Sequence, residues 1–191
     1  IQGADVAGRI VETGRNVDPN RIGERVICDP YIRPSDDYAG WENAGFLGAD
    51  FDGGFAEFVT VPSRNVYRIS EALSLTDEAL CTLPCSGGTA MNMLLMAAVR
   101  SGDTMLVTGA SGGVGTFLVQ IGHALGAKII AVSGKSKIHQ VSKLNPLAVV
   151  DRNSPDFVND ILEITQGDKL SVVADVVGGT YFSDLLSLLQ R

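Results

Sequence analysis

A glycine-rich turn at residues 109–115, GASGGVG, is the stretch of this sequence with the clearest chemical potential. An apolar run precedes it and a helical pattern follows it, which is the context that gives a glycine motif meaning. Ala110 replaces the first glycine of G-x-G-x-x-G, while Gly112 and Gly115 keep the other two. Gly112 would let a pyrophosphate approach the backbone, and Gly115 would let the helix pack closely on the strand. The helix N-terminus would supply free N–H groups to the diphosphate. We expect a dinucleotide site made by Gly109, Ala110, Ser111, Gly112, Gly113, Val114 and Gly115; the alternative is a tight turn that binds nothing.

The residues after the next apolar run indicate which dinucleotide binds. In the NAD form of the motif, an Asp or Glu about 20 residues on hydrogen-bonds the adenosine ribose. Residues 104–150 contain no acidic residue, and the run ends in VSGKSK, with Ser133, Lys135 and Lys137 where the acid is expected. A carboxylate would repel a ribose 2′-phosphate, whereas ammonium groups attract it. These three residues therefore predict NADPH as the cofactor, unless the lysines are ordinary surface charges.

The elements that must hold this turn follow from the pattern after residue 104. Helical stretches separate short apolar runs at residues 104–110, 128–134, 147–150 and 171–177. Alternating strands and helices require a parallel sheet covered on both faces. One apolar stripe runs along the helix after the glycines, and Gly126 follows at the position of a C-terminal cap. The sequence therefore predicts a doubly wound α/β unit.

The first part of the chain has a different pattern. Residues 3–69 carry three β-type runs, GRIVETG, ERVICDP and GGFAEFVTV, separated by Gly, Pro, Asn and Asp. These are the signals of a small all-β unit. Between the runs lies a turn-rich acidic segment, residues 33–57, which we interpret as a solvated surface loop.

A helical linker is expected between the two parts. Ser74 is a candidate N-cap for a first helix, and Pro84 forces a break before a second helical run at residues 88–99. We expect a first domain at 1–95 that includes these helices and a nucleotide-binding domain at 96–191.

Composition excludes several classes of partner. With 15 Lys and Arg against 22 Asp and Glu, the formal charge of −7 does not favour nucleic acid or an anionic membrane. The longest apolar stretch, residues 91–99, is far shorter than the roughly 20 residues of a membrane-spanning helix. Three cysteines are too few for a disulfide framework, which favours a cytoplasmic location.

Taken together, these motifs resemble the medium-chain dehydrogenase/reductase superfamily, in particular its quinone oxidoreductase-like and alcohol dehydrogenase-like members. The resemblance rests on GADVAGRIVETG, GERV, GGFAEFVTVP, LPCSGGTAMNML, VTGASGGVG and DVVGG. It implies a partial GroES-like β domain followed by a truncated Rossmann sheet, with further segments before Ile1 and after Arg191, so that the chain alone is expected to be inactive. It also implies a homo-oligomeric, cytoplasmic NAD(P)(H)-dependent oxidoreductase. It places Thr89, Val177, Gly178 and Gly179 at the nicotinamide cleft and assigns no catalytic residue.

The zinc ligands of such proteins are largely missing. Where zinc-dependent members have GHE, this chain has Gly3, Ala4 and Asp5, and the segment at 30–54 lacks the four cysteines of a structural zinc site. Cys85 matches a catalytic ligand, but zinc requires three protein ligands and a water. We therefore expect no bound metal, although Asp5 could substitute as a ligand.

Three functions remain open. Without zinc, the expected reaction is hydride transfer from NADPH to a small-molecule quinone or α,β-unsaturated carbonyl, because these acceptors need little Lewis-acid assistance. The second is a zinc-containing alcohol dehydrogenase, and the third is a non-catalytic, NADPH-binding, crystallin-like protein.

Overall fold

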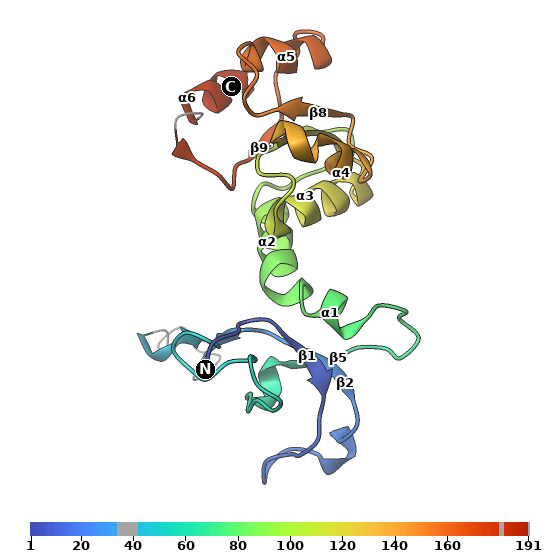
Figure 1. Ribbon diagram of the computed structural model, residues 1–191, viewed down its shortest axis with the longest axis vertical. Helices are drawn as coiled ribbons and strands as arrows, with labels where there is room; N and C mark the ends of the chain where they lie inside the picture. Colours follow the sequence, from blue (N-terminus) through green and yellow to red (C-terminus); the bar gives the residue numbers. More distant parts are fainter. Residues whose placement is uncertain (34–41, 180–181, 191) are drawn as a thin grey trace. The chain divides into compact units, whose positions relative to one another are not determined.

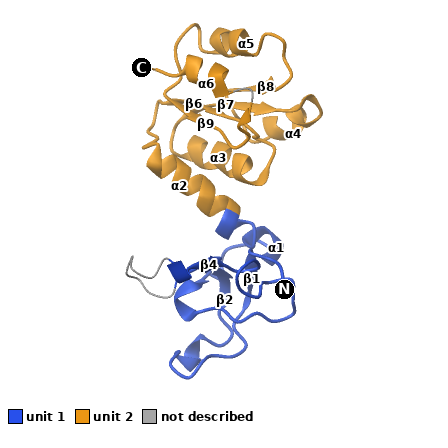
Figure 2. Cartoon of the chain, turned by 90° about the vertical axis from the view of Figure 1, so that its left-hand side faces the viewer, with its two compact units in different colours: residues 1–85 blue, residues 86–191 orange. Residues whose placement is uncertain are grey.

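A computed structural model describes residues 1–33, 42–179 and 182–190 of the chain (Figure 1). The chain divides into two compact units, Ile1–Cys85 and Ser86–Arg191 (Figure 2). The division falls one helix earlier than the expected boundary at residue 95. The reason is that α2 (Gly88–Met96) packs on α3 (Gly113–Ala124), so that its apolar residues share the core of the second unit.

The first unit contains an antiparallel sheet of three strands in the order β1-β2-β5. These strands are β1 (Val6–Arg9), β2 (Arg25–Cys28) and β5 (Val66–Arg68), and a second pair consists of β3 (Tyr31–Ile32) and β4 (Gly45–Phe46). Single 3₁₀ turns occur at Pro19–Arg21 and Ser63–Asn65. The small all-β unit expected from the sequence is therefore present.

The third β-type run, GGFAEFVTV, does not form a strand. Among the described residues, its backbone hydrogen bonds lie at its start, where the N–H groups of Gly53, Gly54 and Phe55 donate to the carbonyls of Ile1, Gly3 and Gln2. Phe55 and Phe58 are 78% and 72% exposed. A segment of high β propensity forms a strand only where the edge of a neighbouring strand can pair with it. Within the described residues, the strand that pairs with β2 on this side is β5.

Helix α1 (Asp77–Leu80) follows β5 in the chain and precedes the second unit. Its N-cap is Thr76 and not the expected Ser74, because the Thr76 hydroxyl accepts the N–H of Ala79 at 3.2 Å. A π-helical turn, Leu83–Gly87, contains Pro84 and precedes α2, as the expected break requires.

The second unit is built on four parallel strands in the order β8-β7-β6-β9. The strands are β6 (Thr104–Val107), β7 (Lys128–Ser133), β8 (Ala148–Asp151) and β9 (Val172–Ala174). Helices alternate with them: α3, α4 (Ile138–Ser142, after a 3₁₀ turn at Lys135–Lys137), α5 (Phe157–Ile164) and α6 (Phe182–Leu188). This is the doubly wound sheet that the sequence predicted.

Alternate residues of the strands pack on opposite faces of this sheet. Met105 and Val107 join a core cluster with residues of α2, α3 and α4, whereas Leu106 joins a second cluster with residues of α5 and α6. Figure 1 shows the helices on both sides of the strands. The strand order changes direction between β6 and β9, so a crevice is expected at the carboxyl ends of these strands. Among the described residues, no helix has the length and apolar character needed to cross a bilayer.

Candidate cofactor-binding site

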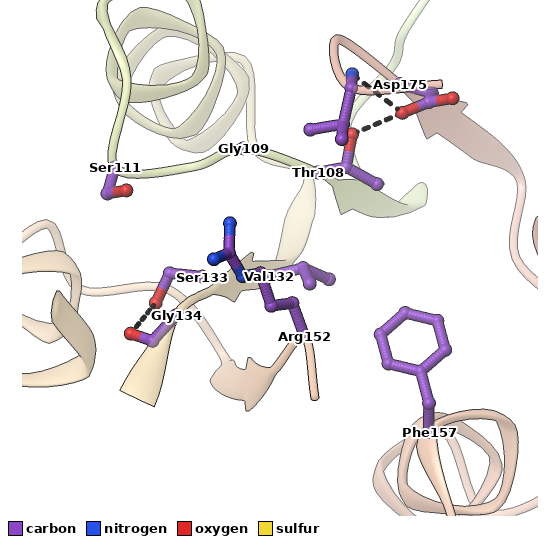
Figure 3. A pocket seen from close by; sticks show the side chains of 10 residues that line it. Thr108, Gly109, Ser111, Val132, Ser133, Gly134, Arg152, Phe157 and Asp175 are labelled. Atoms are coloured by element: carbon purple, nitrogen blue, oxygen red, sulfur yellow. Dashed lines mark hydrogen bonds between the residues drawn. The ribbon is translucent and has the colours of Figure 1, made fainter. Parts of the chain in front are cut away.

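A pocket lies at the carboxyl ends of all four parallel strands, where the fold places the crevice (Figure 3). Its lining comes from the last residues of β7 and the residue after it, from the segments after β6, β8 and β9, and from the start of α5. The lining residues are Thr108, Gly109, Ser111, Val132, Ser133, Gly134, Arg152, Phe157, Asp175 and Val177.

The glycine turn forms one wall and has the close contacts that its sequence indicated. A Cβ on Gly115 would lie 2.2 Å from the carbonyl oxygen of Gly109, so only glycine lets α3 approach β6 this closely. Gly109 has φ +58°, and a Cβ there would lie 2.9 Å from Cγ2 of Val176. At Gly112, by contrast, a Cβ would approach only the Gly109 carbonyl, at 3.3 Å. Gly112 is the exposed N-cap of α3, where an anionic group can reach the backbone.

The turn after β9 forms the facing wall, and Asp175 organises it. The Thr108 hydroxyl donates to Oδ1 of Asp175 at 2.5 Å, and the same hydroxyl accepts the N–H of Val176 at 3.0 Å. Asp175 also accepts the N–H groups of Val177 and Gly178. Burial by itself raises the pKa of Asp175, but these hydrogen bonds outweigh burial and hold its pKa below the ordinary value. The carboxylate is therefore a fixed structural anion and not a proton donor at neutral pH.

The end of β7 forms the third part of the pocket. Ser133 is 3% exposed, and both it and Gly134 line the pocket. Lys135 and Lys137 are exposed on the following 3₁₀ turn and lie outside the lining. The cation in the lining is Arg152, which follows β8.

Sequence reasoning missed Arg152 because it followed one strand only. The register of the parallel pair places Ser133 opposite Asp151, and the N–H of Arg152 donates to the Ser133 carbonyl at 2.9 Å. Residues after adjacent parallel strands meet at the same sheet edge. Reading the end of β8 together with the end of β7 would have identified this residue.

The structure brings together only some of the residues that were expected to contact the cofactor. Gly109, Ser111, Ser133 and Val177 line the pocket. The others lie outside the pocket lining: Thr89, Ala110, Gly112, Gly113, Val114, Gly115, Lys135, Lys137, Gly178 and Gly179. Thr89 is exposed on α2. Their roles toward a cofactor remain predictions.

A separate feature of the first unit bears on metal binding. The N–H of Cys85 donates to Oδ1 of Asp5 at 3.0 Å, so the two residues that could serve as ligands are neighbours. Burial, and then the charge of Asp5, raise the pKa of the Cys85 thiol. In the described parts of the chain, no group of three His, Cys, Asp or Glu residues could hold a metal ion. Asp5 and Cys85 are thus fewer ligands, among the described residues, than the three that a catalytic zinc site requires.

The fold and pocket define a Rossmann-type nucleotide-binding unit preceded by a small β unit, and comparison with known families agrees. Residues 1–71 match the alcohol dehydrogenase GroES-like domain, and residues 113–191 match the zinc-binding dehydrogenase family. The chain belongs to the medium-chain dehydrogenase/reductase superfamily.

The names of individual relatives indicate several different activities. An NAD-dependent alcohol dehydrogenase of Sulfurisphaera tokodaii is 32% identical over 91% of this chain and 52% of its own length. A quinone oxidoreductase-like protein 2 homolog of Nematostella vectensis is 29% identical over 99% of this chain and 47% of its own. Among solved structures, a Sinorhizobium meliloti 1021 protein assigned as an alcohol dehydrogenase is 41% identical in sequence and superimposes with a TM-score of 0.89. The match covers 100% of this chain and 52% of the Sinorhizobium chain. The chain spans about half the length of these relatives.

Proposed function

We propose that the protein is an NADPH-dependent oxidoreductase that transfers a hydride to a quinone or an α,β-unsaturated carbonyl without zinc. The observation that carries this proposal is the pocket at the strand-order switch, with the glycine turn on one side. The acidic residue of its described lining is Asp175, which accepts hydrogen bonds from Thr108, Val177 and Gly178. The relative named as quinone oxidoreductase-like supports the same class of acceptor.

Each wall of the pocket has a separate task in this proposal. The N-terminus of α3 at Gly112 binds the pyrophosphate, because the N–H groups of a first helical turn have no partner within the helix. Thr108 and Asp175 hold the Val177 turn, which positions the nicotinamide end. NADPH supplies the hydride when it is bound, and the chain supplies orientation and a site from which water is excluded. The proposal includes a cytoplasmic homo-oligomer, and the three unpaired cysteines fit a reducing compartment.

The Asp5–Cys85 pair and the alcohol dehydrogenase name of one relative favour a second candidate, a zinc-containing alcohol dehydrogenase. In that case Asp5 and Cys85 would need a further ligand, because Ala4 has no donor atom.

The deciding experiment uses the full-length protein and measures NADPH oxidation with a panel of quinones and enones, and NAD(P)⁺ reduction with alcohols, before and after dialysis against a chelator. With the quinones and enones, we expect turnover at a rate that dialysis against the chelator leaves unchanged. Chelator-sensitive turnover of alcohols would support the second candidate. Cofactor binding without turnover on either panel would indicate a non-catalytic, crystallin-like protein.

Gly112→Val and Gly14→Val form a matched pair of variants for this assay. Gly14 is outside the pocket lining, and a Cβ there meets no atom within 4 Å, so the substitution is expected to leave the fold intact. Turnover should fall in Gly112→Val, where the side chain enters the pyrophosphate space, and should persist in Gly14→Val.

A further inference from the structure

Two of the three cysteines lie four residues apart in the helical segment that leads into α2. Cys81 is the C-cap of α1, and Cys85 lies in the π-helical turn Leu83–Gly87. Both are partly exposed, whereas Cys28 is buried on β2. Along a helical path, residues four apart lie on the same face, with about 5–6 Å between their Cβ atoms. Cys81 and Cys85 are therefore the accessible thiol pair of this chain.

The backbone between the two cysteines can tighten. A disulfide needs about 3.5–4.5 Å between the Cβ atoms, so the segment must close by about 1–2 Å. In a regular α-helix, the N–H of residue 85 would donate to the carbonyl of residue 81 and fix the helical spacing. Here the Cys85 N–H donates to Oδ1 of Asp5 at 3.0 Å, and Pro84 has no N–H. Closure therefore does not have to break a helical hydrogen bond from Cys85 to Cys81.

The residue after Cys85 connects the thiol pair to the glycine turn. Ser86 packs on the first turn of α3, because a Cβ on Gly113 would lie 2.8 Å from Oγ and 3.4 Å from Cβ of Ser86. Gly112 is the N-cap of that helix, where the proposed function places the pyrophosphate. Since one peptide bond joins Cys85 to Ser86, a change in the π-helical turn reaches the N-terminus of α3.

We propose that Cys81 and Cys85 form a reversible disulfide that weakens dinucleotide binding at the glycine turn. This inference rests on the proposed function and deepens it, because it assigns a redox regulation to the same site.

The reaction is thiol–disulfide exchange with a small-molecule disulfide, for which oxidised glutathione is the probe. The thiolate of one cysteine attacks a sulfur of the probe, which forms a mixed disulfide and releases one glutathione. The thiolate of the other cysteine attacks the cysteine sulfur of the mixed disulfide and releases the second glutathione. The two protein thiols are oxidised to one disulfide, and the two glutathione molecules carry away both electrons and both protons. The weak hydrogen bond from the Cys81 thiol to the carbonyl of Glu78, at 3.1 Å, is lost on the way.

The first measurement detects the disulfide itself. The full-length protein is incubated with oxidised or reduced glutathione, alkylated, digested with trypsin and analysed by mass spectrometry. Trypsin cleaves after Arg68 and next after Arg100, so Cys81 and Cys85 fall in one peptide. With oxidised glutathione, we expect this peptide to be unlabelled and two hydrogens lighter than its reduced form. Dithiothreitol should restore both labels, and Cys28, alkylated after unfolding, should be a free thiol throughout.

The second measurement titrates NADPH against the reduced and the oxidised protein. We expect oxidation to weaken binding at least about fivefold. Cys81→Ser is the matched control, because it removes the pair and keeps the hydrogen bond between Cys85 and Asp5. Its affinity should agree in the two buffers within about twofold. In Ser86→Ala, the disulfide should still form, while its effect on affinity should shrink to less than about twofold.

The outcomes separate this inference from the function on which it rests. Alkylation or glutathione on both cysteines after oxidation would mean that the pair does not close, and a disulfide without a change in NADPH affinity would mean that it does not act on the glycine turn. An equal loss of affinity in Cys81→Ser would assign the effect to an adduct on Cys85 alone. Each of these results would overturn the inference and leave the proposed function intact. If the reduced protein binds neither NADPH nor NADH, the proposed function fails, and the regulation of dinucleotide binding fails with it.

Discussion

The hydroxyl of Thr108 donates a 2.5 Å hydrogen bond to Oδ1 of Asp175 and joins the ends of the neighbouring strands β6 and β9. The two residues are far apart in sequence, and the parallel pairing of their strands brings them together. The same Thr108 oxygen accepts the N–H of Val176, so one hydroxyl holds both the carboxylate and the backbone of the next turn. The wall of the pocket that faces the glycine turn is therefore fixed before any cofactor binds.

Asp175→Ala should reduce the free energy of unfolding at pH 7 by about 2 kcal/mol, because three hydrogen bonds to a carboxylate are lost from a partly exposed site. The lowered pKa of Asp175 gives this contribution a pH dependence. The contribution is complete above the unfolded pKa near 3.9 and is lost as the pH falls through the lower folded pKa. Urea unfolding at pH 7, 5 and 3 measures it.

A suitable control for that measurement is Asp168→Ala, which changes an exposed aspartate of the same unit. Its unfolding free energy should stay within about 0.5 kcal/mol of the wild type. If the difference between Asp175→Ala and the wild type were as large at pH 3 as at pH 7, the stabilisation would not come from the ionised carboxylate.

Gly115→Ala and Gly112→Ala should affect different properties. A Cβ at residue 115 would lie 2.2 Å from the Gly109 oxygen and 2.7 Å from Cα of Ala110, so we expect a loss of about 3 kcal/mol in stability. At residue 112 the nearest atom is 3.3 Å away, so stability should fall by no more than about 1 kcal/mol while dinucleotide affinity falls at least about tenfold. Thermal unfolding and cofactor titration separate the two effects. Unchanged affinity in Gly112→Ala would refute pyrophosphate binding at this turn.

The sequence predicted the second unit well because its signals are local and repeated. The alternation of apolar runs with helical stretches determines parallel pairing, and the φ of +85° at Gly126 confirms its position after α3. The first unit was harder, because its strands depend on partners distant in sequence. GGFAEFVTV has the composition of a strand, yet the described residues form backbone hydrogen bonds only with its first three residues.

The pocket residues were likewise predictable only where their roles depend on residues near in sequence. Gly112 and Gly115 could be interpreted from spacing, since their roles depend on one turn and the helix that follows. Arg152 and Asp175 could not, because each acquires its role from a neighbouring strand end, which only the strand order specifies. The lysines after β7 were prominent in the sequence, but the 3₁₀ turn that carries them leaves the pocket lining to Ser133 and Gly134.

Cys28 should be the least reactive of the three cysteines. It is 3% exposed on β2, and burial raises the pKa of its thiol to about 11, so about one thiol in a thousand is ionised at pH 8. We expect iodoacetamide to modify Cys81 at least about a hundredfold faster, as measured by mass spectrometry, and all three cysteines to react alike in urea. Because the folded pKa is raised, the stability linked to Cys28 should fall as the pH rises from about 9 to about 11. Rapid labelling of Cys28 in the folded chain would contradict the packing of β2.

Zinc should not bind this chain with the affinity of a catalytic site. Zinc requires three protein ligands and a water, whereas Ala4 offers no donor atom and the described residues contain no cluster of three suitable side chains. Oδ1 of Asp5 already accepts the Cys85 N–H. After dialysis against a chelator and addition of one equivalent of zinc, elemental analysis should find well under one zinc per chain.

The same experiment on Cys85→Ser and Asp5→Asn gives the control. A stoichiometric zinc that both substitutions remove would establish a site built on Asp5 and Cys85 and would favour the alcohol dehydrogenase reaction, whereas zinc retained equally by all three proteins would lie elsewhere on the surface.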